Sequence, residues 1–280
     1  MPPAEQKKRR ENREQKERRK LFSNKLGGYV FVSVCNQNLS PATAARLIYL
    51  STFLNYDGII YKTERTPMMR GDLSQIMMLS KSETYTFWGK VKNTFISEPE
   101  EGFLRFCDDF SFRGKMPKSL QQFQQFYIKS VQDLYKKTPT RKHKYLGYVF
   151  SLLQYINIEH NILCFNPTEK LLNDIRPITV NDFCRMIGYD IRNRARLLET
   201  YASITFPFEG KNERFCSFIT DRGDIGKAMI IVNPHILYHG QDGEHVRKLG
   251  KFCEPKIECS TSFCGKKKGG LYGAVSFLHH

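Results

Sequence analysis

Two stretches of equal length can be laid on one another without a gap, GDLSQIMMLSKSETYTFW (71–88) and NDFCRMIGYDIRNRARLL (181–198). Apolar positions fall on apolar positions throughout. Each stretch has the spacing of two short amphipathic helices separated by a tight turn. Ser80 falls on Asp190, and both residue types cap the first turn of a helix. The sequence therefore predicts that one helix–turn–helix unit occurs twice.

The similarity continues upstream of both stretches. Each is preceded by an apolar, aromatic-rich helical run that ends at an Asn, LIYLSTFLN (47–55) and YVFSLLQYIN (148–157). A short apolar strand follows in each case, GIIY (58–61) and NILCF (161–165). The loop after the strand is longer in the second copy, a difference that a surface loop tolerates. Chance similarity between short amphipathic helices is the alternative explanation.

In the first copy, further elements are expected on both sides of this core. YVFVSV (29–34) is typical of a strand, and Ser40 followed by Pro41 predicts a helix that runs to about residue 55. Glu83 stands three positions after Ser80, which is the spacing of a capping box. FLRFCDDFSFRG (103–114) alternates aromatic and polar residues around two Asp and predicts a β-hairpin.

The second copy is expected to begin after a linker near residues 115–120. Amphipathic patterns predict helices over Phe126–Lys136 and Lys142–Ile156. Residues 213–220 and 227–234 are strand-like and flank a turn with two glycines, which predicts a second hairpin.

This order of helix, strand, helix, tight turn, helix and hairpin is typical of a winged helix-turn-helix. We therefore predict a mainly α protein with small β-hairpins, of α+β class, built as a tandem winged helix-turn-helix. The expected parts are a basic N-terminal arm (1–25), a first winged-helix domain (26–116), a second winged-helix domain (117–250) and a basic Cys-containing tail (251–280).

The chain carries a formal charge of +16, and both of its ends are basic. Residues 5–20 hold nine Lys or Arg and four Glu. Such a distribution suits a polyanionic partner such as double-stranded DNA, or an anionic membrane surface. A protein that is simply basic is the third explanation. The arm itself could lie on phosphates or be a solvated tail.

The helix after each tight turn holds the candidate base-reading residues, because the first turns of a recognition helix reach base edges in the major groove. Lysines further along such a helix are expected to touch the DNA backbone. A solvated helix face is the alternative. The candidates are Lys81, Ser82, Thr84, Tyr85, Lys90 and Lys92 in the first copy and Arg192, Asn193, Arg194 and Arg196 in the second.

Basic residues in or beside the two predicted hairpins are candidates for phosphate contact. Charged loop tips with no ligand are the alternative. These residues are Arg105 and Arg113 in the first copy and Arg222 and Lys227 in the second.

No motif predicts catalysis, a cofactor or a metal site. Cys253, Cys259 and Cys264 are separated by six and five positions, and neither gap fits the paired Cys-x2–4-Cys knuckles of structural zinc. Hydrolase, metalloprotease and Walker motifs are absent. No apolar run is long enough for a transmembrane helix, and the charged N-terminus is no secretory signal. We expect a non-enzymatic, cytoplasmic protein.

The second half resembles the replication initiator proteins of Gram-positive plasmids and their phages. The resemblance rests on YINIEHNILCFNP (155–167), ITVNDFCRMIGYD (178–190) and the run MIIVNPHILYHGQ…VRKLGKF (229–252). The first half, LIYLSTFLNYDG…DLSQIMMLS, is similar to related DNA-binding proteins of phages and plasmids. Together these segments cover roughly residues 40–250.

The resemblance implies a protein that binds origin or operator DNA. The expected function is sequence-specific binding of double-stranded DNA by a plasmid or phage protein, in replication initiation or transcription control, with a homodimer extending the footprint. The alternative is a phage winged-helix factor that binds a host protein of the polymerase or replisome. A nicking initiator is the enzymatic rival.

Overall fold

The computed structural model describes residues 3–33, 39–99, 101–107, 109–114, 123–220, 224–239 and 243–254. These residues form two compact units. Unit one contains the described residues up to Gln154 together with Pro234–Arg247. Unit two contains Tyr155–Asn233 together with the described residues from Lys248 onward. The predicted boundary between residues 116 and 117 lies outside the described residues, and residues 123–154, assigned from sequence to the second domain, belong to unit one.

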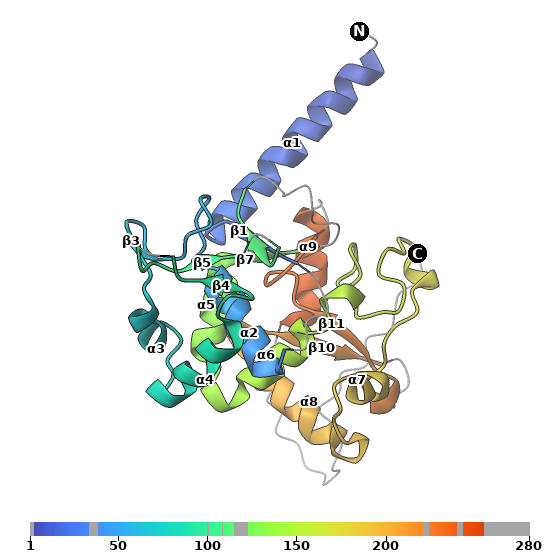
Figure 1. Ribbon diagram of the computed structural model, residues 1–280. Coiled ribbons are helices and arrows are strands. Elements are labelled where there is room, and N and C mark those ends of the chain that lie inside the picture. Colours follow the sequence, from blue (N-terminus) through green and yellow to red (C-terminus); the bar gives the residue numbers. More distant parts are fainter. Residues whose placement is uncertain are drawn as a thin grey trace. The chain divides into compact units, whose positions relative to one another are not determined.

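Both units combine helices with small antiparallel sheets, in agreement with the predicted α+β class (Figure 1). Unit one contains α1 (Pro3–Lys25), β1 (Tyr29–Ser33), α2 (Pro41–Ser51), β2 (Tyr61–Thr63), β3 (Thr66–Pro67), η1 (Arg70–Asp72), α3 (Leu73–Ile76), α4 (Lys81–Val91), β4 (Ile96–Ser97), β5 (Arg105–Phe106), β6 (Ser111–Phe112), β7 (Phe123–Tyr127), α5 (Ile128–Lys137), η2 (Thr140–Lys142) and α6 (His143–Phe150). The chain passes between units within η3 (Leu153–Tyr155), between Asn233 and Pro234, and within α9 (Gly243–Gly250).

Unit two contains a shorter set of elements. They are η4 (Leu172–Asp174), α7 (Val180–Met186), η5 (Ile191–Asn193), α8 (Arg194–Ala202), β8 (Thr205–Phe208), β9 (Lys211–Arg214), β10 (Cys216–Ile219), η6 (Ile225–Lys227), β11 (Met229–Val232) and η7 (Lys251–Cys253).

The largest sheet of unit one is built from segments that lie far apart in the sequence. β1 occupies its centre and pairs antiparallel with β6 and with β7. The other edge of β7 bonds to the returning chain, where the Tyr127 amide donates to the Ile236 carbonyl at 2.9 Å. Val30 and Val32 of β1 are buried, so the sheet covers the apolar core.

Two helices of unit one, α2 and α6, cross at unusually short range. α2 begins at Ser40, whose hydroxyl accepts from the Thr43 amide, and Pro41 takes the first helical position as predicted. α6 meets this end of α2 at Gly147, where an added Cβ atom would lie 1.6 Å from the Pro41 carbonyl oxygen. Only a residue without a side chain fits there.

The predicted hairpin over residues 103–114 is wrong. β5 pairs with β4, which precedes it, and β6 pairs with β1. The alternating pattern did mark strands, because Phe106 and Phe112 are both buried. Periodicity indicates that a segment is extended, but the partner is chosen by long-range packing.

The predicted helix from Phe126 needs a smaller correction, whereas the predicted strand at 29–34 is confirmed over residues 29–33 and its last residue lies outside the described residues. Residues 123–127 form β7, and α5 begins only at Ile128, because the β1 edge supplies a ladder for that segment. The helix expected over Lys142–Ile156 ends at Phe150 and is followed by the short turn η3. β1 covers residues 29–33 of its expected range.

Three β-bridges of unit one have counterparts in unit two, in the same order along the repeat. Those of unit one are Leu54↔Ile60, Ile59↔Arg105 and Met69↔Phe103, and their counterparts are Ile156↔Leu163, Ile162↔Ile231 and Thr179↔Met229. The β4–β5 pair corresponds in the same way to β10–β11, the hairpin predicted in the second copy and confirmed with Cys216 opposite Val232. The two units therefore share one local strand arrangement around their helices.

The tight turn between the paired helices also recurs. Met78 and Gly188, which fall on one another in the aligned stretches, both have positive φ, 54° and 67°. Ser80 accepts from the Glu83 amide and forms the predicted capping box of α4, while Asp190 caps η5. Unit two also contains the hairpin β8–β9, which the sequence did not predict, with Glu209 and Gly210 in its turn.

Candidate nucleic-acid interface

The continuous helical segment η5–α8 presents the predicted reading residues of the second copy. Leu197, Leu198 and Tyr201 are buried and fix one face of α8 against unit two. Arg192, Asn193 and Arg196 are exposed on the outer side. Among the described residues no carboxylate lies within ion-pair distance of Arg196. This face can therefore offer cationic and amide groups to a ligand.

Arg192 is exposed and forms an ion pair with the carboxylate of Asp190. Its Nη2 lies 2.9 Å from Oδ2 of Asp190, and the same Asp accepts from the Arg192 amide at 2.9 Å. These hydrogen bonds hold the pKa of the Asp190 carboxyl below its usual value and raise the pKa of the Arg192 guanidinium. The sequence prediction missed this pair, although an Asp two positions before an Arg at a helix start is a visible signal.

Arg194 is placed differently from its neighbours. It is half-buried, and its Nη1 donates to the Ile191 carbonyl of the preceding turn at 3.4 Å. Arg185, on α7, is exposed and pairs with Asp182 at 2.8 Å. Of the four residues predicted to read bases, three are therefore exposed, whereas Arg194 is half-buried and hydrogen-bonded to the backbone of the preceding turn.

In unit one, α4 presents a less cationic surface. Lys81, Ser82, Tyr85, Lys90 and Lys92 are exposed, and Tyr85 is 74% exposed. Thr84 is half-buried and its hydroxyl donates to the Ser80 carbonyl at 2.9 Å.

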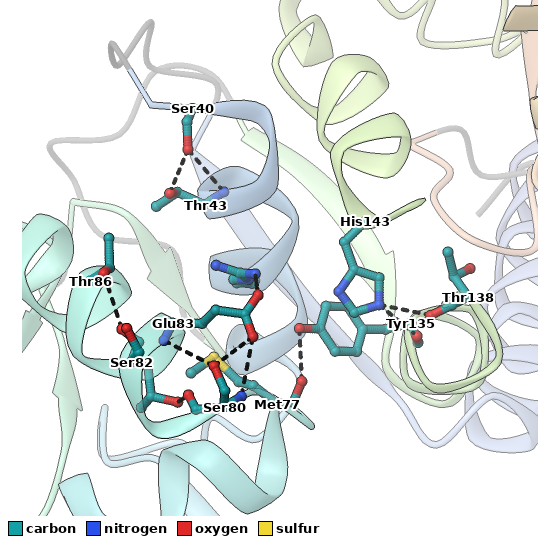
Figure 2. Close-up of polar contacts among 12 residues, drawn as sticks. Ser40, Thr43, Met77, Ser80, Ser82, Glu83, Thr86, Tyr135, Thr138 and His143 are labelled. Carbon is teal, nitrogen blue, oxygen red and sulfur yellow. Dashed lines mark hydrogen bonds and ion pairs between the residues drawn. The ribbon is translucent and has the colours of Figure 1, made fainter. Parts of the chain in front are cut away.

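Glu83 also lies at the start of α4, but it faces the cap. Its carboxylate accepts from the Ser80 hydroxyl and amide and lies 3.5 Å from Arg46 (Figure 2). The Ser80 hydrogen bonds hold the pKa of the Glu83 carboxyl below its usual value. Glu83 therefore belongs to the cap and leaves the outer face of α4 without an acid.

A buried aromatic cluster supports the turn that precedes α4. The Tyr49 and Tyr135 rings stack at 3.8 Å, and the Tyr49 hydroxyl donates to the Ile76 carbonyl. The Tyr135 hydroxyl donates to the Met77 carbonyl (Figure 2). Nε2 of His143 lies 2.8 Å from the Thr138 carbonyl. Burial lowers the pKa of His143, so its ring is neutral and Nε2 carries the proton donated to that carbonyl. The cluster fixes the start of α4 on the core.

The basic residues predicted in the hairpins are not equivalent. Arg105 is exposed on β5. Arg113 is half-buried, donates to the Leu54 carbonyl at 3.3 Å and lies over the Tyr56 ring at 4.9 Å. Lys227 is exposed at the end of η6, and Arg222 lies outside the described residues.

The loop that joins β4 to β5 corresponds to the β10–β11 loop of unit two. It contains Glu98 and Glu101, and Gly102 adopts a positive φ of 77°. The sequence SEPEEG (97–102) has the composition of a turn, a signal that could have located this hairpin. This loop is acidic, whereas its counterpart in unit two contains two basic residues, Arg222 and Lys227, and two acids, Asp221 and Asp224.

The helix α1 is exposed along most of its length. Every residue from Glu5 to Leu21 whose side chain the structure describes is exposed, while Phe22 contacts the Tyr127 ring at 5.5 Å. Figure 1 shows α1 as a long helix that extends away from the β1–β7 strands of unit one. A cationic stripe runs along one side at helical spacing and consists of Arg9, Arg13, Lys16 and Lys20.

Neither a metal cluster nor a membrane span is found in the described part of the chain. No three His, Cys, Asp or Glu side chains there come together as metal ligands would. Of the three tail cysteines, Cys253 is buried and reduced, and Cys259 and Cys264 lie outside the described residues. None of the helices described has the length and apolarity needed to cross a bilayer.

Comparison with known proteins adds no relative: no family model, no curated protein and no solved structure matches this chain.

Proposed function

We propose that this protein is a tandem winged-helix protein that binds double-stranded DNA sequence-specifically, in replication initiation or transcription control of a plasmid or phage. The observation that carries the proposal is the recurrence, in both units, of the same three β-bridges around a helix–turn–helix whose second helix is exposed. In a winged helix, the second helix of this motif enters the major groove and the hairpin lies along the backbone.

The second unit supplies the base-reading surface in this proposal. Arg192, Asn193 and Arg196 are the groups that hydrogen-bond to purine edges, because Arg pairs with guanine and Asn with adenine. The exposed methyl group of Ala195 suits contact with a thymine methyl. The resemblance of residues 155–252 to plasmid and phage initiators supports the biological setting, and a homodimer would double the site.

The first unit adds backbone contacts through Lys81, Lys90 and Lys92. α1 adds a separate cationic surface, which suits phosphates because each neutralised phosphate releases counterions.

A second candidate function is favoured by one feature of unit one. The loop after β4 contains Glu98 and Glu101, and such acids repel phosphates. The turn between α3 and α4 exposes Met78, 45%, and α4 exposes Tyr85, 74%. An apolar, partly acidic surface suits a protein partner better than DNA. The second candidate is therefore a protein contact of the polymerase or replisome through unit one.

The proposal is tested by selecting bound sequences from a random duplex library with the full chain. A selected sequence, and its loss in Arg196→Ala, is the expected result. The variant should bind the selected site more weakly by about 1–3 kcal/mol. Binding of all duplexes with equal affinity would contradict sequence-specific recognition.

A further inference from the structure

The helix that begins at Asp190 contains an arginine held by the residue that caps it. Asp190 Oδ1 accepts from the Arg192 amide at 2.9 Å. The same carboxylate lies against the arginine side chain, with Nε 3.2 Å from Oδ1 and 3.1 Å from Oδ2, and with Nη2 2.9 Å from Oδ2. The carboxylate therefore covers one edge of the guanidinium, the edge formed by Nε and Nη2.

The second edge of this guanidinium, formed by Nη1 and Nη2, stays open. A guanidinium has five N–H groups in one plane. The contact with Asp190 uses the Nε hydrogen and one Nη2 hydrogen, which leaves both Nη1 hydrogens and the second Nη2 hydrogen. The Arg192 side chain is 90% exposed, so these donors face solvent.

Two parallel donors on one edge match guanine. In the major groove guanine presents two acceptors, O6 and N7, whereas adenine presents one acceptor and one donor. A phosphate also offers two oxygens to an arginine. A phosphate would, however, bring a second anion to a guanidinium that already carries a carboxylate, and like charges repel. The neutral guanine edge carries no such penalty.

The other two arginines of this helix lack this arrangement. Arg194 donates to the Ile191 carbonyl, and Arg196 has no carboxylate within ion-pair distance among the described residues. Arg192 alone of the three combines an open fork with a partner that restrains its rotamers. Restraint before binding reduces the entropy cost of binding and favours one orientation of the fork.

We infer that Arg192 reads a guanine in the major groove, and that Asp190 is the positioning residue that orients its guanidinium. The inference rests on the proposed DNA binding and names one base of the site. Asp190 touches no DNA in this arrangement and acts through Arg192.

The test compares duplex selection by the full chain with selection by Arg192→Ala, Asp190→Asn and Asp190→Ser. Asn and Ser both keep a helix cap and both remove the charge. The wild-type site should contain a guanine whose replacement weakens binding on the order of tenfold. All three variants should lose most of that preference. Asp190→Asn should bind random duplex as well as or better than the wild type, because an acid near phosphates has been removed.

A modified base identifies the contact. Replacing that guanine by 7-deazaguanine removes the N7 acceptor, and should weaken the wild type but leave Arg192→Ala unchanged. Thermal unfolding of each variant checks that it is folded.

The outcomes separate this inference from the proposed function. If Asp190→Asn strengthens binding to the selected site and to random duplex by the same factor, Arg192 contacts a phosphate, and the inference is overturned while DNA binding stands. If the variants keep the guanine preference, Asp190 and Arg192 have no reading role. If selection yields no sequence, the proposed function fails and the inference fails with it.

Discussion

Gly147 shows how one atom can set the packing of two helices. A Cβ atom at this position would lie 1.6 Å from the Pro41 carbonyl oxygen. Gly147→Ala should therefore push α6 away from α2 and lower the free energy of unfolding by about 1–3 kcal/mol, or more. Gly89→Ala is the matched control in α4, where no atom lies within 4 Å of an added Cβ. It should stabilise the helix by about 0.5–1 kcal/mol. Urea unfolding measures the free energy of unfolding of both variants. Equal changes in the two would contradict the close crossing of α2 and α6.

His143 should make stability depend on pH. Burial lowers its pKa in the folded state, whereas the unfolded chain takes up a proton near the ordinary value of about 6.5. The contribution of the neutral His143 ring to the free energy of unfolding is therefore complete above about pH 6.5 and decreases as the pH falls below that value. His143→Gln keeps a donor for the Thr138 carbonyl but cannot titrate. Its free energy of unfolding should fall less between pH 7 and pH 5 than that of the wild type. Parallel curves of the free energy of unfolding against pH would show that His143 does not contribute to the pH dependence.

At the scale of elements, the loop before α7 depends on one buried amide. The Asn157 side chain donates to the Pro167 and Glu169 carbonyls at 3.1 and 2.8 Å and accepts from the Glu159 and His160 amides. Asn157→Ala removes these four hydrogen bonds from half-buried backbone groups and should lower the free energy of unfolding by about 1–3 kcal/mol.

Hydrogen exchange should locate this destabilisation in residues 167–171. Asn55, the corresponding residue of the first copy, accepts one side-chain hydrogen bond among the described residues, from the Tyr56 amide. Asn55→Ala is the control and should cost less than Asn157→Ala. Similar decreases in the free energy of unfolding of the two variants would show that the Asn157 side chain does not organise the longer loop.

The helix α1 should steepen the salt dependence of DNA binding. Deleting residues 1–20 should flatten the slope of the log binding constant against the log salt concentration by about 0.9 for each phosphate that α1 neutralises in the wild type.

A sharper test compares two variants of α1 that each remove two positive charges and one ion pair with Glu. Arg13→Gln with Lys16→Gln changes the cationic stripe, and Lys7→Gln with Arg10→Gln changes another side of the helix. The first variant should flatten the slope more. Equal slopes for these two variants would show that only net charge matters.

At the scale of the whole molecule, the question is whether both units bind one duplex. Tyr85→Ala and Arg196→Ala each change the exposed helix of one unit. If both helices contact DNA, the two decreases in binding free energy should add in the double variant, because the contacts are independent. Fluorescence anisotropy of the labelled selected duplex measures the binding free energies of the single and double variants. An unchanged affinity in Tyr85→Ala would favour a protein partner for unit one.

Local chemistry accounts for what could be predicted from the sequence. The helix starts at Pro41, Lys81 and Ile191 were located correctly because a cap and the amides that it binds lie within three residues of each other. The β10–β11 hairpin was predicted for the same reason, since its strands are close in the chain. The exposed position of Arg196 follows from helical spacing alone.

Long-range packing accounts for the rest. β6 pairs with β1, and the chain returns from unit two to bond with β7, so these partners are chosen between segments distant in sequence. The orientation of Arg194 and the ion pair of Arg192 depend on rotamers that a residue pattern does not encode. A sequence pattern specifies which face of an element is apolar, whereas its partner is selected by the total free energy of packing all elements together.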